Sequence, residues 1–280
     1  MKRIYTVASG LTLALISANV LLYLYKPLGE NFYIIGDSLV AALALLAVLA
    51  GFYAFRPHGL KSVQGRALFF VTAGVFFWFL GELAWGIYEI ALGIKPVVSA
   101  ADIFWFIGYP MFILGLYYVS KISSVALGKK KLAVFVAAII VVFSSIIYLT
   151  IPTLIDAIPL EEKIVTAGYA IGDSVLIIGI IFVIICLFDS RFARPWSIIL
   201  LSIVASTIAD IYYMYFFTAY ETGNLIDILW NTNYILFTLG CIYHRETVKD
   251  IVSASGIGIK AVGSTTKETM TAAKDRKSKI

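Results

Sequence analysis

Apolar residues gather into eight segments of about 20 residues, and the short connections between them hold most of the charged residues. An α-helix of that length crosses roughly 30 Å of hydrocarbon, the thickness of a bilayer core. The segments cover approximately 5–25, 31–54, 66–93, 102–122, 132–151, 164–188, 195–219 and 225–244. The pattern predicts an all-α integral membrane protein with eight transmembrane helices.

The basic residues fall in alternate connections, which indicates how the chain is oriented. One side of the membrane receives Lys2, Arg3, Arg56, Lys61, Arg66, Lys121, Lys129, Lys130, Lys131, Arg191, Arg194, Arg245 and Lys249. The connections on the other side are mainly acidic and contain only Lys26, Lys95 and Lys163 as basic residues. The positive-inside rule therefore predicts a multi-pass protein of the cell (plasma) membrane with both termini in the cytoplasm.

Composition indicates that the lipid bilayer is the main partner of this chain. Of its 280 residues, 61% are hydrophobic and 14% are charged, whereas soluble domains carry about 25% charged residues. The net charge of +5 is compatible with binding to nucleic acid. Because the basic residues follow the expected membrane topology, no nucleic-acid partner is predicted.

Two parts of the sequence recur, which predicts an internal duplication. The motif IGDS occurs in the second and sixth segments, so Asp37 corresponds to Asp173, an offset of 173 − 37 = 136. The fourth and eighth segments match at an offset of 125, which pairs Asp102 with Asp227, Trp105 with Trp230, Tyr109 with Tyr234, Gly115 with Gly240 and Tyr118 with Tyr243. Four helices per unit predict two parallel repeats, 1–125 and 126–244, followed by a basic cytoplasmic tail, 245–280.

Acidic residues inside the apolar segments are the main candidates for function, because a charge in the bilayer costs several kcal/mol. Their carboxyl groups must be protonated, hydrogen-bonded, hydrated or paired with a bound cation. With the aromatic residues expected nearby, they predict an acidic pocket that opens outward, while hydrogen bonding between helices is the structural alternative. The residues predicted to bind a ligand or cation are Asp37, Glu82, Asp173, Asp210, Trp85, Tyr88 and Tyr213, with Asn19, Ser144 and Ser145 on the facing helices.

A second group of polar and aromatic residues lies nearer the predicted outer rim. Asp102 and Asp227 each precede an apolar run, a position typical of a helix cap. Trp105, Trp230, Tyr109 and Tyr234 follow within one to two turns and fit an interfacial belt or packing, with pocket lining as the alternative. Pro110 predicts a kink in the fourth helix.

Several kinds of chemistry have no matching residues. The two histidines, His58 and His244, both lie at the predicted cytoplasmic side, so paired haem ligands and histidine zinc sites are not expected within the membrane. No lysine lies in the middle of a helix to form a Schiff base, and no phosphate loop or nucleophile elbow occurs. The sequence predicts neither an enzyme nor a cofactor and leaves the identity of any metal open.

One stretch resembles a known class of membrane module. GELAW is followed by a short loop and then by SAADIFWFIGYP, and this resembles the multi-helix sensor modules that precede PAS, histidine-kinase or GGDEF domains in archaeal and bacterial signalling proteins. The resemblance rests on Gly81, Glu82, Trp85, Ser99, Asp102, Phe104, Gly108, Tyr109 and Pro110. It implies a signal-input role. Because a short basic tail follows the last helix where such proteins continue into an output domain, either signalling needs a separate partner or the module serves another purpose here.

Three functions are therefore considered. The first is a stand-alone sensor or receptor-like module whose eighth helix passes a change at the acidic pocket to a cytoplasmic signalling partner through the C-terminal tail. The second is a small proton- or cation-coupled transporter with Glu82 and Asp210 as the carriers. The third is a structural or assembly protein in which the acidic residues only join helices.

Overall fold

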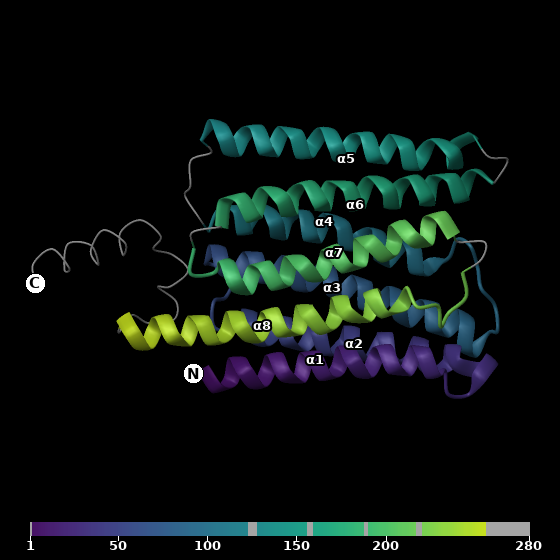
Figure 1. Cartoon of the computed structure of the whole chain (residues 1–280), viewed down its shortest axis with the longest axis horizontal. Helices are drawn as coiled ribbons and strands as arrows, with labels where there is room; N and C mark the ends of the chain where they lie inside the picture. The colour runs from purple at the N-terminus through teal and green to yellow at the C-terminus, as the bar shows by residue number, and fades with distance from the viewer. Residues whose placement is uncertain (1, 123–127, 156–158, 188–189, 217–219, 256–280) are drawn as a thin grey trace, which may run out of the picture.

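A computed structural model describes residues 2–122, 128–155, 159–187, 190–216 and 220–255, and this part of the chain contains eight α-helices and no strand. Consecutive helices run in opposite directions and form one elongated bundle (Figure 1). The helices are α1 (Lys2–Tyr25), α2 (Phe32–Phe55), α3 (Val63–Gly86), α4 (Ala100–Ser120), α5 (Lys129–Ile155), α6 (Leu160–Leu187), α7 (Ala193–Phe216) and α8 (Asp227–Ser255). Two short helices, η1 (Gly29–Asn31) and the π-helical η2 (Ile87–Ala91), precede α2 and follow α3.

The helix boundaries follow local signals in the sequence. Ser62 caps α3, because its Oγ accepts a hydrogen bond from the backbone N–H of Gly65 at 2.9 Å. Ser99 caps α4 as part of a capping box, in which the Asp102 carboxylate accepts from the Ser99 backbone N–H at 2.7 Å. At the other end of the chain, α8 continues to Ser255 instead of ending near 244. The remainder of the expected tail, 256–280, lies outside the described residues.

Six of the helices close into a ring. In order, α2, α3, α4, α6, α7 and α8 each contact the next, and α8 contacts α2 to complete the circuit. The other two helices lie outside: α1 packs on α8, and within the described residues α5 packs on α6 alone. In Figure 1, α1 and α5 accordingly lie at opposite edges of the bundle. The arrangement separates six ring helices, which share an interior, from two peripheral ones.

Small residues allow the ring helices to approach closely. A Cβ added at Gly115 of α4 would lie 2.5 Å from Val71 Cγ1 of α3, and one at Gly240 of α8 would lie 2.5 Å from Ile199 Cγ1 of α7. The face of α6 toward α4 is also made of glycines, including Gly172 against the Tyr109 ring. Such contacts are typical of membrane helices, where packing replaces hydrophobic burial as the driving force.

The outer surface of the bundle is apolar, as a lipid-facing surface requires. Large apolar side chains are exposed along the peripheral and ring helices, for example Leu13, Leu49 and Ile140. Six helices, namely α1, α2, α3, α4, α6 and α7, are long and apolar enough to cross a membrane on the grounds of length and composition. The chain is thus compatible with a polytopic membrane protein.

Pro110 lies inside α4, which continues from Ala100 to Ser120. One local expectation, on α5, differs from the structure. On α5, Ser145 is exposed, and its hydroxyl donates to the Val141 carbonyl of the same helix at 2.9 Å. The expectation that Ser144 and Ser145 face the acidic residues is wrong, because both side chains are exposed on a peripheral helix.

Candidate functional site

Acidic side chains gather at one end of the ring, where α2, α4, α6 and α8 begin and α3 and α7 end. We call this the acidic end and the opposite one the basic end. The acidic end holds Asp37, Glu82, Glu89, Asp102, Asp173, Asp210 and Asp227. Of these, Glu82 and Asp210 are partly buried and the other five are buried. The ring thus brings together acids from all six of its helices and from η2, which follows α3.

Two tyrosines join the acidic residues across helix boundaries. The Tyr109 hydroxyl of α4 donates to Asp173 Oδ1 of α6 at 2.9 Å, and Thr207 of α7 donates to the same oxygen at 3.4 Å. The Tyr234 hydroxyl of α8 donates to Glu82 Oε1 of α3 at 2.7 Å. Both tyrosines are buried. They therefore lie inside the bundle as donors to carboxylates, and the expectation of an interfacial belt is wrong for them.

The two predicted rim tryptophans also face inward. Trp230 Nε1 donates to Asp210 Oδ1 at 2.8 Å, and the Ser206 hydroxyl donates to Asp210 Oδ2 at 3.5 Å. Trp105 packs its indole against Gly81, so closely that a Cβ there would lie 2.4 Å from Trp105 Nε1. Each indole therefore lies beside the acid-bearing turn of the preceding helix.

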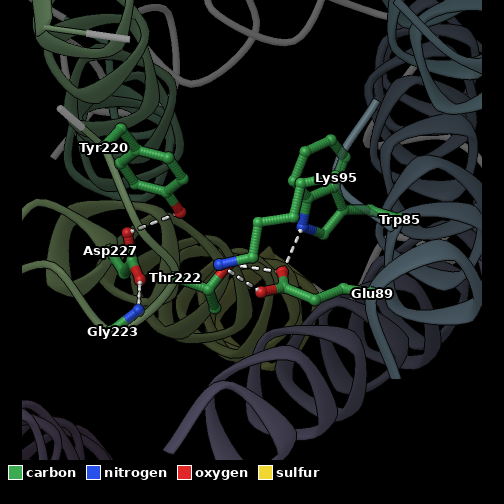
Figure 2. A network of polar contacts seen from close by, with 7 residues as sticks. All are labelled: Trp85, Glu89, Lys95, Tyr220, Thr222, Gly223 and Asp227. Atoms are coloured by element: carbon green, nitrogen blue, oxygen red, sulfur yellow. Dashed lines mark hydrogen bonds and ion pairs between the residues drawn. The ribbon is translucent and has the colours of Figure 1, made fainter. Parts of the chain in front are cut away.

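Asp102 and Asp227 stabilise the starts of α4 and α8, and each also accepts from a tyrosine. Asp102 Oδ1 accepts from the Tyr169 hydroxyl at 2.7 Å, in addition to its role in the capping box. Asp227 accepts from the Tyr220 hydroxyl at 3.0 Å and from the Gly223 backbone N–H at 2.7 Å (Figure 2). Helix capping, the role expected for Asp102 and Asp227, therefore accounts for only part of their contacts.

Glu89 is the centre of a second set of contacts and the one member of the cluster with an ion pair among the described residues. Its carboxylate accepts from Trp85 Nε1 at 3.0 Å and from the Thr222 hydroxyl, and it lies 2.9 Å from Lys95 Nζ (Figure 2). Trp85 is one of the predicted binding residues, whereas Glu89 is not among them. The π-helical turn after Gly86 brings Glu89 into the bundle, where it is 3% exposed.

Asp37 is a buried acid with one unpartnered carboxyl oxygen. It is 3% exposed, and its Oδ2 has no hydrogen-bond partner in the described part of the chain. A Cβ at Gly86 of α3 would lie 3.7 Å from Asp37 Cβ, so α3 passes close to the carboxyl-bearing turn of α2. Glu82 and Glu89 are both near enough to repel a charge on Asp37.

The remaining predicted aromatics have different surroundings. Tyr213 of α7 packs edge-on to Tyr220, with ring centroids 4.9 Å apart, and lies 6.1 Å from the Trp230 ring. Tyr88 lies in the π-helical turn and is partly buried. Tyr213 is thus beside the Asp210 and Trp230 pair.

Sequence reasoning missed several donors of the cluster, and one of them could have been found. Tyr169 lies four residues before Asp173, and Tyr33 lies four residues before Asp37, so the predicted internal repeat would include both tyrosines. Tyr220 and Thr222 lie in the connection before α8, which has no matching segment in the first half. Asn231 is also absent from the prediction; its Nδ2 donates to Asn19 Oδ1 at 3.0 Å and links α8 to α1.

The basic end is closed by buried aromatic and imidazole rings. The His244 ring of α8 lies 5.4 Å from the His58 ring and 5.7 Å from the Trp196 ring, and its Nε2 is 3.0 Å from Gln64 Oε1. Burial, together with the nearby charge of Arg245, lowers the pKa of His58 to about 4. His58 is therefore neutral at pH 7.

Comparisons with known proteins return no match: no family model, no curated protein and no solved structure is similar to this chain. Among the described residues, no group of three or more His, Cys, Asp or Glu side chains is arranged to hold a metal ion. The candidate site is therefore described from its own residues. It is a set of buried and partly buried carboxylates that accept hydrogen bonds from tyrosine, tryptophan and hydroxyl donors.

Proposed function

We propose that this chain is a sensor or receptor-like module of the plasma membrane, in which all eight helices cross the bilayer and both termini lie in the cytoplasm. In this proposal, protons or a small cation bind among the carboxylates of the acidic end, on the outer side. The change in charge is then passed along α8 to the basic end and to a signalling partner. The observation that carries the proposal is that α8 holds buried polar contacts at both of its ends.

The position of α8 in the ring supports its crossing of the membrane. It contacts α1, α2 and α7, which are long and apolar enough to span, and its 29 residues extend over roughly 40 Å. Its polar residues face the interior: Asn231, Asn233 and His244 are each at most 1% exposed. Interior polar side chains lower the hydropathy of a helix without exposing polar groups to lipid. The exposed face of the peripheral helix α5 is apolar, which supports the proposal that α5 also crosses the bilayer.

Contacts made by the repeated residues support the two parallel four-helix units. Glu82 and Asp210 differ by 210 − 82 = 128, and Val71 and Ile199 differ by 199 − 71 = 128. Val71 packs on Gly115 and Ile199 packs on Gly240, the pair already matched between α4 and α8. The α3–α4 and α7–α8 pairs thus use the same register.

Repulsion among the acids is the physical basis for binding a positive charge. Asp210 is near enough to interact electrostatically with both Glu82 and Asp173, and the ion pair in this cluster involves Glu89 instead. A proton or monovalent cation shared between neighbouring carboxylates removes that repulsion. The tyrosine and tryptophan donors would then rearrange, because each bonds to a specific carboxylate oxygen.

The contacts of α8 offer a route for such a change. Near its start, Trp230 and Tyr234 donate to Asp210 and Glu82. Toward its other end, the Tyr243 hydroxyl donates to the Tyr5 carbonyl at 3.2 Å. A small rotation or shift of one continuous helix would alter both sets of contacts together.

The proposal can be tested with the full chain reconstituted in lipid vesicles. Tryptophan fluorescence is recorded as the outer pH and the Na⁺ or K⁺ concentration are changed, for the wild type and for Glu82→Gln with Asp210→Asn. We expect a saturable change in the wild type that is lost in the double variant, while helicity is kept. Glu30→Gln, an exposed acid outside the cluster, is the matched control. An unchanged response in the double variant would contradict the proposal.

The same vesicles distinguish the proposed sensor from a transporter and from an assembly protein. The two repeats with acids between them are also the arrangement of small carriers. If the chain is a sensor, a pH-sensitive dye inside the vesicles reports no protein-dependent flux when a proton or cation gradient is imposed. Flux that depends on Glu82 would establish the transporter instead. Absence of both binding and flux would leave the acids as contacts between helices.

A further inference from the structure

A groove lies between α5 and α6 near the basic end. It is lined by Lys130, Lys131 and Val134 of α5 and by Ile184 and Ile185 of α6. Its wall is apolar apart from the two lysines, which belong to the first turn of α5. The groove therefore has an almost wholly apolar surface and includes two lysines among its lining residues.

The surroundings of the groove determine which molecules can reach it. Because α5 contacts only α6 among the described helices, the groove faces away from the ring interior. Val134 is 61% exposed and Ile184 is 42% exposed, so both would be in contact with lipid. Phe135 and Phe182 join the two helices beside it, with ring centroids 5.2 Å apart.

The lysines have unused capacity for an anion. Lys131 Nζ donates to the Ile185 carbonyl at 3.5 Å, a long hydrogen bond, and Lys130 is exposed. Neither forms an ion pair within the described part of the chain. The first-turn N–H groups of α5 add a partial positive charge at the same level.

We infer that this groove is a binding site for an anionic phospholipid, with an acyl chain against Val134, Ile184 and Ile185 and the headgroup phosphate on Lys130 and Lys131. Basic pockets between membrane helices near the headgroup level have this chemistry. The bound lipid would add contacts between α5 and α6 at a place where α5 has no other helix to pack on. This inference rests on the proposed crossing of the bilayer by α5, but it does not depend on the function proposed for the acidic end.

Lipid retention on the full chain tests the inference. The protein is reconstituted with mixtures of phosphatidylglycerol and phosphatidylcholine, extracted in mild detergent and analysed by native mass spectrometry. We expect phosphatidylglycerol to be retained preferentially. Because each basic residue near a headgroup contributes about fivefold in affinity, the double variant Lys130→Gln, Lys131→Gln should reduce retention by about 30-fold.

Two further variants separate a site from general attraction of anionic lipid. Lys129→Gln removes the same charge from the same run of lysines but does not line the groove, so it should retain lipid within about twofold of the wild type. Val134→Trp fills the apolar part and should reduce retention with all lysines present. Equal loss in Lys129→Gln, or no loss in Val134→Trp, would overturn the inference.

In the last part of the experiment, inorganic phosphate is added at millimolar concentration to the protein with its retained lipid. It should not displace the retained phosphatidylglycerol, because it cannot occupy the apolar wall. Displacement by phosphate would overturn the lipid assignment and indicate a simple anion site. Thermal stability in each lipid mixture confirms that every variant is folded before retention is compared.

Discussion

The helix pairs α3–α4 and α7–α8 use the same contacts locally but different partners at a distance. In both pairs a glycine of the second helix packs on a branched side chain of the first, Gly115 on Val71 and Gly240 on Ile199. Farther out, Tyr109 of α4 donates to Asp173 of α6, whereas Tyr234 of α8 donates to Glu82 of α3.

The two helix pairs also differ in how the peripheral helices pack against them. α1 packs on α8, whereas α5 packs on α6 and, among the described residues, does not contact α4. Neighbouring residues in a helix pair are thus enough to specify how the pair packs. The partners of the tyrosines depend on how the pairs assemble into the ring. Four changes would break or sharpen this comparison.

The largest expected effect comes from the shared glycines. Gly115→Leu and Gly240→Leu would each place a side chain where even a Cβ lies 2.5 Å from the facing residue and about 3 Å from its backbone nitrogen. We expect each to lower the free energy of unfolding by about 3 kcal/mol, at the upper end of the cost of overpacking. Denaturation in detergent micelles followed by circular dichroism measures the loss. Gly10→Leu, where nothing lies within 4 Å, should be close to neutral, and a similar cost there would refute the argument.

The next effect tests a contact that only one half makes. His58 follows α2 and packs on His244, which corresponds to the aliphatic Val119 of α4 (244 − 125 = 119). Because the pKa of His58 falls from 6.5 to about 4 on folding, protonation favours the unfolded chain. Stability is complete above pH 6.5 and declines toward pH 4, by about 2 kcal/mol between pH 7 and pH 5.

Comparison with His58→Phe isolates this pH dependence from that of other groups. The phenylalanine variant keeps an aromatic ring at the site and removes the titrating nitrogen atoms. Its stability should decline less between pH 7 and pH 5 than that of the wild type. Parallel curves for the two proteins would mean that burial of His58 does not resist protonation.

A smaller effect distinguishes the two tyrosine contacts. Tyr109→Phe and Tyr234→Phe each remove one hydrogen bond to a carboxylate and should lower stability by about 1 kcal/mol. Since Asp173 also accepts from Thr207, Tyr109→Phe should cost less than Tyr234→Phe. Thermal denaturation of the two single variants and the double variant measures the costs. They should add, because the tyrosines bond to different acids.

The smallest effect concerns the peripheral helices. Tyr23→Phe of α1 removes the one hydrogen bond that its hydroxyl accepts from Asn231 of α8 at 3.2 Å, and it should cost about 0.6 kcal/mol, the mean for such a bond between membrane helices. Ser145→Ala on α5 removes a bond within its own helix at an exposed position, and no measurable change is expected. Chemical denaturation curves of both variants test the contrast. Equal effects would show that α1 and α5 are attached alike.

Much of the fold could be read from the sequence because apolar length and helix caps are local properties. All eight helices lie where the apolar segments indicate, and their ends differ mostly by a few residues. The end of α8 is the exception, because the polar residues after His244 continue as helix beside α2 and α1. The crossing of α5 and α8, and the repeat as a unit of architecture, remain part of the proposal.

The candidate site was less accessible to sequence reasoning. Asp37, Glu82, Asp173 and Asp210 could be selected because intramembrane acids are costly. Their donors could not, since Tyr220 and Thr222 come from a connection with no periodic pattern. The contact of Trp85 with Glu89 could not be predicted either, since it follows a π-helical turn that periodicity does not reveal.

By itself, the sequence determined where helices form, because hydrophobic length, capping residues and clustered charge act over a few neighbouring residues. It also supplied the prediction of an internal repeat, in which Asp37 corresponds to Asp173 and Tyr109 to Tyr234. Only the tertiary structure decided that six helices close into a ring with α1 and α5 outside. It also decided which tyrosine reaches which carboxylate, since a hydrogen bond between helices depends on distances and angles that residue spacing along one helix does not contain.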